Sequence, residues 1–112
     1  MPDDLSGLGR FASPSLAILL ALGRGPQHGY AIMAGVRELT GEPLGPGTLY
    51  ATLSRLERRG LIEALPAQER RRPYRLTTAG ATVLRTQLEG IEDIAREGLA
   101  RLGRSEGSGT SP

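Results

Sequence analysis

The stretch GPGTLYATLSRLERRGLI, residues 45–62, has the periodicity of a helix with two different faces. At about 100° per residue, Leu49, Leu53 and Leu56 form a core-facing stripe. A second arc, roughly 90° away, carries hydroxyl and guanidinium groups and no acid: Thr48, Thr52, Arg55 and Arg59. Short hydroxyls reach phosphates and base edges, and the arginine fork matches guanine O6 and N7. The arc therefore predicts contact with nucleic acid, and the alternative is an ordinary solvated face.

The two glycines at the start of this helix fit the same prediction. Gly45 and Gly47 allow backbone N–H groups to approach a phosphate at the positive end of the helix dipole. Arg58 points away from the arc, and we expect it to be solvated or paired with an acid.

Positive charge is concentrated in the same part of the chain. The formal net charge is only +2, but residues 45–76 hold seven arginines against three glutamates, whereas the remaining residues carry an excess of acid. Such a local patch can steer a polyanion toward the protein. All fourteen basic residues are arginine, which suits bidentate phosphate and guanine contacts, although coding bias is the simpler explanation for the missing lysines.

Composition excludes several other classes of site. The chain of 112 residues has room for one small domain, and with 4% aromatic residues its core must be mostly aliphatic. It has no cysteine and one histidine, His28, so we expect no disulfide, metal site or other cofactor, and no catalytic constellation. The longest apolar run, residues 16–22, is far too short to span a membrane, and Asp3 and Asp4 do not suit a signal peptide, so we expect a cytoplasmic protein.

Two helices must precede the quoted one. Ser13 and Pro14 predict a helix start before the apolar run that ends at Leu22. A second helix is predicted over residues 29–40, with Gly41 as its left-handed cap. A short turn then leads to the third helix, from residue 45 to Gly60, which completes a helix-turn-helix. His28 is expected to serve as a capping or turn residue.

Beyond Gly60 the pattern changes to that of a β-hairpin. Residues 61–65 and 74–76 read as two short strands joined by a polar loop, a wing that follows the third helix directly. Arg70, Arg71 and Arg72 near its tip are expected to neutralise phosphates, the alternative being an exposed loop without function. Tyr74 is expected to pack the wing onto the body.

A long helix is predicted over residues 77–102. Its apolar residues recur at alternating spacings of four and three, typical of a coiled-coil seam. The residues predicted to form a dimer interface are Leu84, Leu88, Ile91, Ile94, Ala95, Leu99 and Leu102. Intrachain packing is the alternative. The expected organisation is a flexible arm at 1–12, a winged helix-turn-helix domain at 13–76, this dimerisation helix, and a disordered tail at 103–112. The fold class is therefore mainly α with a small β-hairpin wing.

Three segments resemble the PadR family of bacterial winged-helix transcription regulators: HGYAIM at 28–33, GPGTLYATLSRLERRGLI at 45–62, and RRPYRLTTAG at 71–80. The single C-terminal helix is similar to that of the small subgroup, in which it builds a homodimer. The resemblance implies that Thr48 and Tyr50 touch DNA, that Arg55 is the basic position one turn further on, and that Gly29 and Tyr30 lie against phosphates. The chain departs from the family at the wing tip, where the frequent glycine is absent, and in having no tryptophan.

These observations predict a regulator that binds double-stranded DNA as a homodimer. We expect a repressor with an inverted-repeat operator whose half-sites lie about 34–36 Å apart. An effector of unknown identity would act through the C-terminal helices and residues 16–22. The rival reading is a winged-helix module that docks a partner protein through the long helix, and a small enzyme ranks third.

Overall fold

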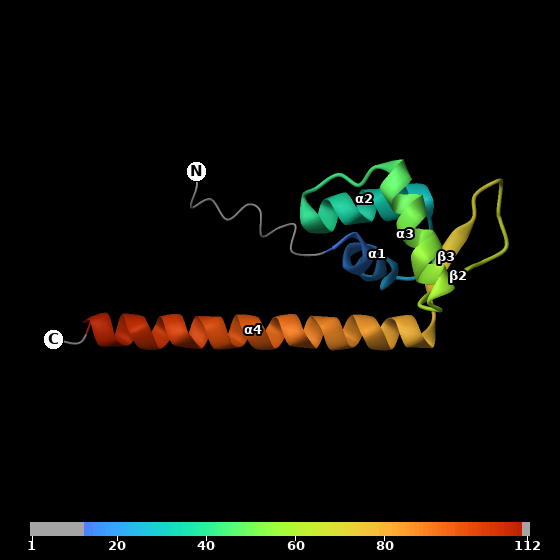
Figure 1. The fold of residues 1–112 in the computed structure, drawn as a ribbon. Helices are drawn as coiled ribbons and strands as arrows, with labels where there is room; N and C mark the ends of the chain where they lie inside the picture. Colours follow the sequence, from blue (N-terminus) through green and yellow to red (C-terminus); the bar gives the residue numbers. More distant parts are fainter. Residues whose placement is uncertain (1–12, 111–112) are drawn as a thin grey trace.

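The computed structural model describes residues 13–110, and side chains over residues 13–104. This part of the chain forms a head of three helices and a small sheet, beneath which a long last helix runs and extends far beyond the head (Figure 1). The elements are α1 Pro14–Leu22, β1 Gln27–His28, α2 Gly29–Thr40, α3 Pro46–Arg58, β2 Ile62–Ala64, β3 Pro73–Leu76 and α4 Thr78–Thr110. The predicted fold class, mainly α with a β-hairpin wing and a long C-terminal helix, is confirmed.

Local capping signals determine where the first helices begin and end. The Ser13 hydroxyl accepts a hydrogen bond from the Leu16 N–H at 3.2 Å, and Pro14 occupies the first turn of α1. His28 caps α2 as predicted, its Nδ1 accepting from the Ala31 N–H at 3.4 Å. Gly41 closes α2 with a φ of 73°, a left-handed conformation that favours glycine. The predicted bounds of these two helices are therefore confirmed.

The core lies where α1, α2, α3 and the sheet meet. The largest fully buried side chains among the described residues are Ile18, Leu22, Ile32, Leu49, Leu53, Leu56 and Ile62. Each such burial contributes roughly 1.5–3 kcal/mol of hydrophobic stabilisation. Helix α1 is apolar on nearly every side because α2, α3 and α4 all pack against it.

The sheet has three strands in the order β1-β3-β2, all antiparallel, and β1 was not predicted. Gln27 pairs with Tyr74, and on the other side of β3, Ala64 also pairs with Tyr74. A strand of two residues is too short to produce a detectable alternation in the sequence. This strand fixes the start of α2 beside the wing, because β1 immediately precedes α2 and pairs with β3 at the base of the wing.

The wing tip is a tight two-residue turn. The Gln68 N–H donates to the Arg71 carbonyl at 2.7 Å, and the Arg71 N–H donates to the Gln68 carbonyl at 2.8 Å. Between them, Glu69 and Arg70 have φ values of 49° and 68°. Positive φ at both central residues is the pattern of a type I′ hairpin turn, usually made by Asn-Gly. The missing glycine is therefore replaced by two residues held in a strained conformation.

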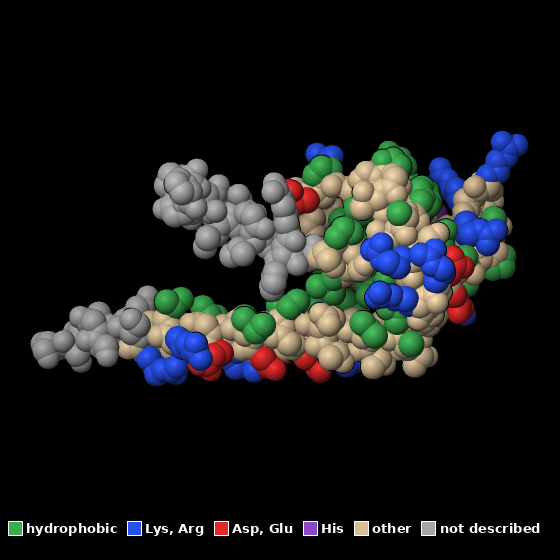
Figure 2. Space-filling view, in the orientation of Figure 1, with side chains coloured by type: hydrophobic (Ala, Val, Ile, Leu, Met, Phe, Trp, Pro, Cys, Tyr) green, Lys and Arg blue, Asp and Glu red, His purple; other side chains and the backbone are tan. Residues whose placement is uncertain are grey.

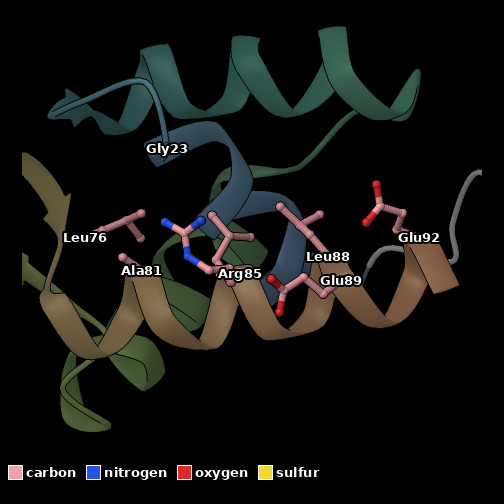
Figure 3. Close-up of a pocket in the computed structure, with 8 residues that line it drawn as sticks. Gly23, Leu76, Ala81, Arg85, Leu88, Glu89 and Glu92 are labelled. Atoms are coloured by element: carbon pink, nitrogen blue, oxygen red, sulfur yellow. The ribbon is translucent and has the colours of Figure 1, made fainter.

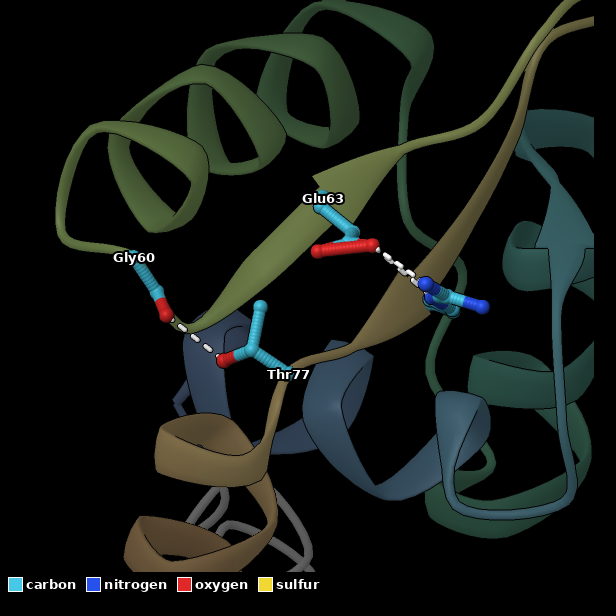
Figure 4. A network of polar contacts seen from close by, with 4 residues as sticks. Gly60, Glu63 and Thr77 are labelled. Carbon is cyan, nitrogen blue, oxygen red and sulfur yellow. Dashed lines mark hydrogen bonds and ion pairs between the residues drawn. The ribbon is translucent and has the colours of Figure 1, made fainter.

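A polar junction joins the start of α4 to the end of α3. The Thr77 hydroxyl donates to the Gly60 carbonyl at 2.6 Å (Figure 4). The Thr77 N–H donates to the Leu61 carbonyl at 3.1 Å. The Gly80 N–H in turn donates to the Thr77 hydroxyl at 3.0 Å, so Thr77 caps α4 as expected. Gly80 lies so close to Leu61 that a Cβ there would collide with the Leu61 carbonyl.

Helix α4 continues past its expected end at Leu102 and runs to Thr110, so a disordered tail beginning at residue 103 was wrong as far as residue 110. The glycines of this segment argued for disorder, but extending an existing helix requires no new nucleus, so each glycine costs only about 1 kcal/mol. Residues 111–112 and the arm expected at 1–12 lie outside the described residues. Within residues 13–110, no helix is both long and apolar enough to cross a membrane.

Candidate nucleic-acid interface

The buried stripe of α3 is broader than its leucines alone predict. It includes Thr52, which is 2% exposed and the one buried polar side chain among the described residues. Thr52 therefore cannot contact DNA in this structure, and its assignment to the predicted DNA-binding arc was wrong. The reason is that α3 packs against both α1 and α2, so its buried face is wide enough to include the residue next to the leucine row.

The other members of the predicted arc are exposed and lie on one flank of α3. These are Thr48, Arg55 and Arg59. Arg55 is oriented toward the start of α1, where its Nη2 donates to the Ser15 hydroxyl at 3.3 Å. The arc is therefore the side of α3 nearest α1, and Arg59 follows the last helical residue.

Another row of exposed residues points directly away from the core. Counting about 100° per residue from the centre of the buried stripe, Arg58 lies roughly 170° away, and Ala51 and Ser54 lie about 150° away on either side. Gly47 begins the same row. We call Gly47, Ala51, Ser54 and Arg58 the crest of α3. Ala51 and Ser54 were not predicted to contact DNA, although their position opposite the leucine stripe could have identified them.

On the opposite flank, three separate segments of the chain line one hollow of about 310 Å³. The segments are the start of α2, the start of α3 and the wing. The lining residues are His28, Gly29, Tyr30, Tyr50, Arg70, Arg71, Arg72 and Tyr74. Six of these were predicted to bind DNA from three separate stretches of sequence, and the structure brings them together.

Gly29 has a different part in this hollow from the one expected. It is buried, and a Cβ built on it would lie 2.6 Å from the Tyr50 hydroxyl. A direct phosphate contact by Gly29 was therefore the wrong expectation. Its lack of a side chain instead allows Tyr50 to lie across the first residue of α2.

The tyrosines of the hollow differ in exposure. Tyr30 and Tyr50 are 75% and 51% exposed, so their hydroxyls are available to a ligand. Tyr74 is half-buried, and this burial raises its pKa, to which the Glu57 carboxylate and Tyr50 add. Tyr74 is protonated at neutral pH, as a tyrosine with an ordinary pKa also is, and it can donate a hydrogen bond. The sequence predicted for Tyr74 only a role in packing the wing onto the body.

Arginines contribute unequally to the charge of this face. The guanidinium of Arg75 is bound to the Glu63 carboxylate at 2.6 Å, which neutralises both (Figure 4). Arg70, Arg71 and Arg72 are all exposed, and the Arg71 Nη1 lies 3.3 Å from Nε2 of His28. In Figure 2, arginine side chains gather over α3 and the wing. This face therefore combines unneutralised guanidinium groups, hydroxyls and the N-terminal end of α2, which together suit a phosphate polymer.

The residues predicted for a dimer interface divide into two groups along α4. Leu84 is only 7% exposed and belongs to the core, because α1 lies over the first turns of α4, so assigning it to a dimer seam was wrong. Ile91 is partly buried. The exposed members of the seam are Leu88, Ile94, Ala95, Leu99 and Leu102. In Figure 2, hydrophobic side chains follow the edge of α4 that faces the head, and charged ones follow the opposite edge.

A second hollow, of about 420 Å³, lies between α4 and the end of α1. Figure 3 shows Arg85 and Leu88 projecting from α4 toward Gly23, with Leu76 beside them and Glu89 at the rim. Its volume falls within the range of about 300–1,000 Å³ that is usual for small-molecule sites.

Comparisons with known proteins agree with this geometry. Residues 18–86 match the family model described as the transcriptional regulator PadR-like family. The chain is 44% identical over 80 residues to a 37.1 kDa uncharacterised protein of a Streptomyces fradiae transposon, covering 71% of this chain and 23% of that protein's length. It is 40% identical over 73 residues to a transcriptional regulator of Mycobacterium tuberculosis, covering 62% of this chain and 68% of that one.

Solved structures resemble most of this fold. A PadR family transcription regulator from Clostridium difficile has a TM-score of 0.70 and 29% identity, covering 80% of this chain and 97% of that one. Bacillus subtilis PadR in complex with operator DNA has a TM-score of 0.59 and 28% identity, covering 66% of this chain and 45% of that one. Family members are transcription regulators, which confirms the prediction that the chain is not an enzyme. With the winged helix, the hydroxyl-bearing and basic α3, and a family match over more than half of its length, this chain belongs to the PadR-like family of transcriptional regulators.

Proposed function

We propose that the chain binds double-stranded DNA sequence-specifically, with α3 in the major groove and the wing on the adjacent backbone. The observation that carries the proposal is the hollow in which tyrosine hydroxyls and wing arginines from three segments converge beside α3. A helix of about 10–12 Å diameter fits a major groove about 12 Å wide. The similar Bacillus subtilis protein was solved in complex with operator DNA, which supports the same mode of binding here.

The active form is a homodimer joined through α4. Ile94, Leu99 and Leu102 are 67%, 70% and 61% exposed, an apolar row that a single chain leaves in water. At about 1.5 Å per residue, the 33-residue helix is roughly 50 Å long and extends well past the head that covers its first turns. A two-fold dimer places two recognition helices on an inverted-repeat operator, with half-sites about 34–36 Å apart.

Repression follows if this operator overlaps a promoter, so that bound protein excludes polymerase in the cytoplasm. A small-molecule effector in the hollow between α1 and α4 would alter how the two α4 helices pack, and with it the distance between the recognition helices. An effector that binds the protein without changing operator affinity or dimerisation would contradict this part of the proposal.

The test of DNA binding is selection of bound fragments from random duplex DNA by the purified protein, followed by affinity measurements on the selected operator over a range of salt. The wing variant R70A/R71A/R72A should lose affinity and lower the slope of log affinity against log salt, because fewer counterions are released. A matched control is R96A/R101A/R104A, which also removes three arginines but from the polar edge of α4. If the wild-type protein selects no sequence, or the control weakens binding as much as the wing variant, the proposal is wrong and a partner protein becomes the better explanation.

A further inference from the structure

The side chains of α3 occupy three directions outside the core, and each direction has different neighbours. One flank lies beside the start of α1, where Arg55 is bound to Ser15. The other flank faces the wing hollow, where Tyr50 lies over Gly29. Between them stands the crest, which no other described element covers. When α3 lies in a major groove with its crest toward the bases, its two flanks face the two DNA backbones that line the groove.

The crest residues differ sharply in size and charge along the helix. Gly47 and Ala51 project little, which lets the first two turns come close to a surface. Ser54 and Arg58 follow at a spacing of one turn, about 6 Å along the axis. The Arg58 side chain is exposed and makes no ion pair or hydrogen bond to another described residue, so its guanidinium is available to a ligand.

We propose that Arg58 and Ser54 are the residues of this chain that read bases, whereas Arg55 contacts the phosphate backbone. This inference rests on the proposed DNA binding and goes further by assigning specificity. Arg58 alone combines the outward direction with a planar fork, and guanine is the base that presents two acceptors to such a fork in the major groove. Ser54, one turn earlier, reaches a base about two steps away.

Arg55 cannot take the same role without losing its place in the structure. It lies only about 110° from the centre of the buried stripe, and its guanidinium is drawn sideways toward Ser15. From this position a cation meets the backbone at the groove edge. Such contacts add affinity for any sequence and carry no direct base information.

The experiment compares base preferences, and not affinity alone. The operator selected by the wild-type protein is varied at each base pair, and the affinity of every duplex is measured by fluorescence anisotropy for the wild type and for R58A, S54A and R55A. R58A should flatten the preference for guanine at one position of each half-site by roughly 10-fold or more. R55A should weaken all duplexes by a similar factor and lower the salt slope by about one per protomer.

A conservative variant separates the fork from the charge. R58K keeps the positive charge, so it should retain the wild-type salt slope and still lose most of the guanine preference. Unchanged base preferences in both R58A and R58K, or loss of one specific preference in R55A, would overturn the assignment. Failure of the wild-type protein to select any motif would instead refute the proposed function, so the two failures are distinguishable. Circular dichroism checks that each variant is folded.

Discussion

Tyr50 and Gly29 are the pair whose contact most directly connects sequence to function. Gly29 was expected to lie against a phosphate, but its structural role is to make room for the Tyr50 hydroxyl. The string Gly-Tyr at the start of α2 therefore matters because of a residue twenty-one positions later in the chain. No periodicity within α2 reveals that relation, because the contact is made between helices.

Replacing Gly29 with alanine should weaken DNA binding more than it weakens the fold. The added Cβ would lie 2.6 Å from the Tyr50 hydroxyl, so this half-exposed ring must swing away from the hollow. We expect G29A and Y50F each to lower operator affinity several-fold, and the double variant to be little weaker than either one, because both disturb a single group. The measurement is a double-mutant cycle in operator affinity. Fully additive losses would contradict the contact.

The wing tip holds strain at two adjacent residues, and the strain can be relieved. Glu69 and Arg70 both have positive φ, which costs a residue with a side chain about 1 kcal/mol or more. Glu69→Asn should therefore raise the free energy of unfolding by a few tenths to about 1 kcal/mol, since asparagine tolerates this conformation. Thermal melts at one protein concentration test it, with Ala67→Asn as the control, because Ala67 precedes the turn. An equal gain in the control would contradict the strain.

At the scale of elements, the sequence predicted those whose signals are local. Capping residues such as Ser13, Pro14 and Gly41 predicted the bounds of α1 and α2, and the spacing of the leucines predicted α3. Strand β1 was missed because two residues carry no alternation, and the burial of Thr52 was missed because it depends on which helices cover α3. Three segments far apart in the sequence were therefore predicted to bind DNA independently of one another. Only the folded structure shows that they line one hollow.

Two glycines of α4 should respond in opposite ways to the same substitution. At Gly80 a Cβ would collide with the Leu61 carbonyl, a backbone group that cannot swing aside, so G80A should cost about 3 kcal/mol of stability. At Gly90 a Cβ would meet nothing within 4 Å, so G90A should stabilise the helix by up to about 1 kcal/mol. Chemical denaturation of both variants measures the difference. If G80A proved neutral, α4 would not be fixed to the end of α3 through this close approach.

The junction at Gly80 also has a consequence for how the elements move together. Thr77 is bonded to both Gly60 and Leu61, immediately after the recognition helix, and it also caps α4. Two hydrogen bonds and one close backbone contact therefore fix the start of α4 to the residues that follow α3, so a change in the direction of α4 would be expected to move the end of α3. This rigid link is what the proposed effector mechanism requires.

For the whole molecule, the decisive question is whether two copies of the chain bind one DNA duplex together. If α4 joins them, the second recognition helix binds at a high effective concentration, and the affinity for a full operator greatly exceeds that for one half-site. A glutamate in the exposed seam should remove this advantage, because pairing would then bury an unpaired charge. Leu99 is the best position, since it is 70% exposed and supports nothing in its own chain.

We expect Leu99→Glu to shift the protein toward monomers in analytical ultracentrifugation and to weaken full-operator binding by at least 10-fold. The affinity for a single half-site should stay within about twofold of the wild-type value, because α3 and the wing are unchanged. Thr86→Glu adds the same charge on the opposite edge of α4 and should change neither property. Leu84→Ala should instead destabilise the head by about 2–5 kcal/mol, because Leu84 is buried in its own chain. A Leu99→Glu protein that remains dimeric would show that α4 pairs through another face, and loss of half-site binding would show that the charge has disturbed the head itself.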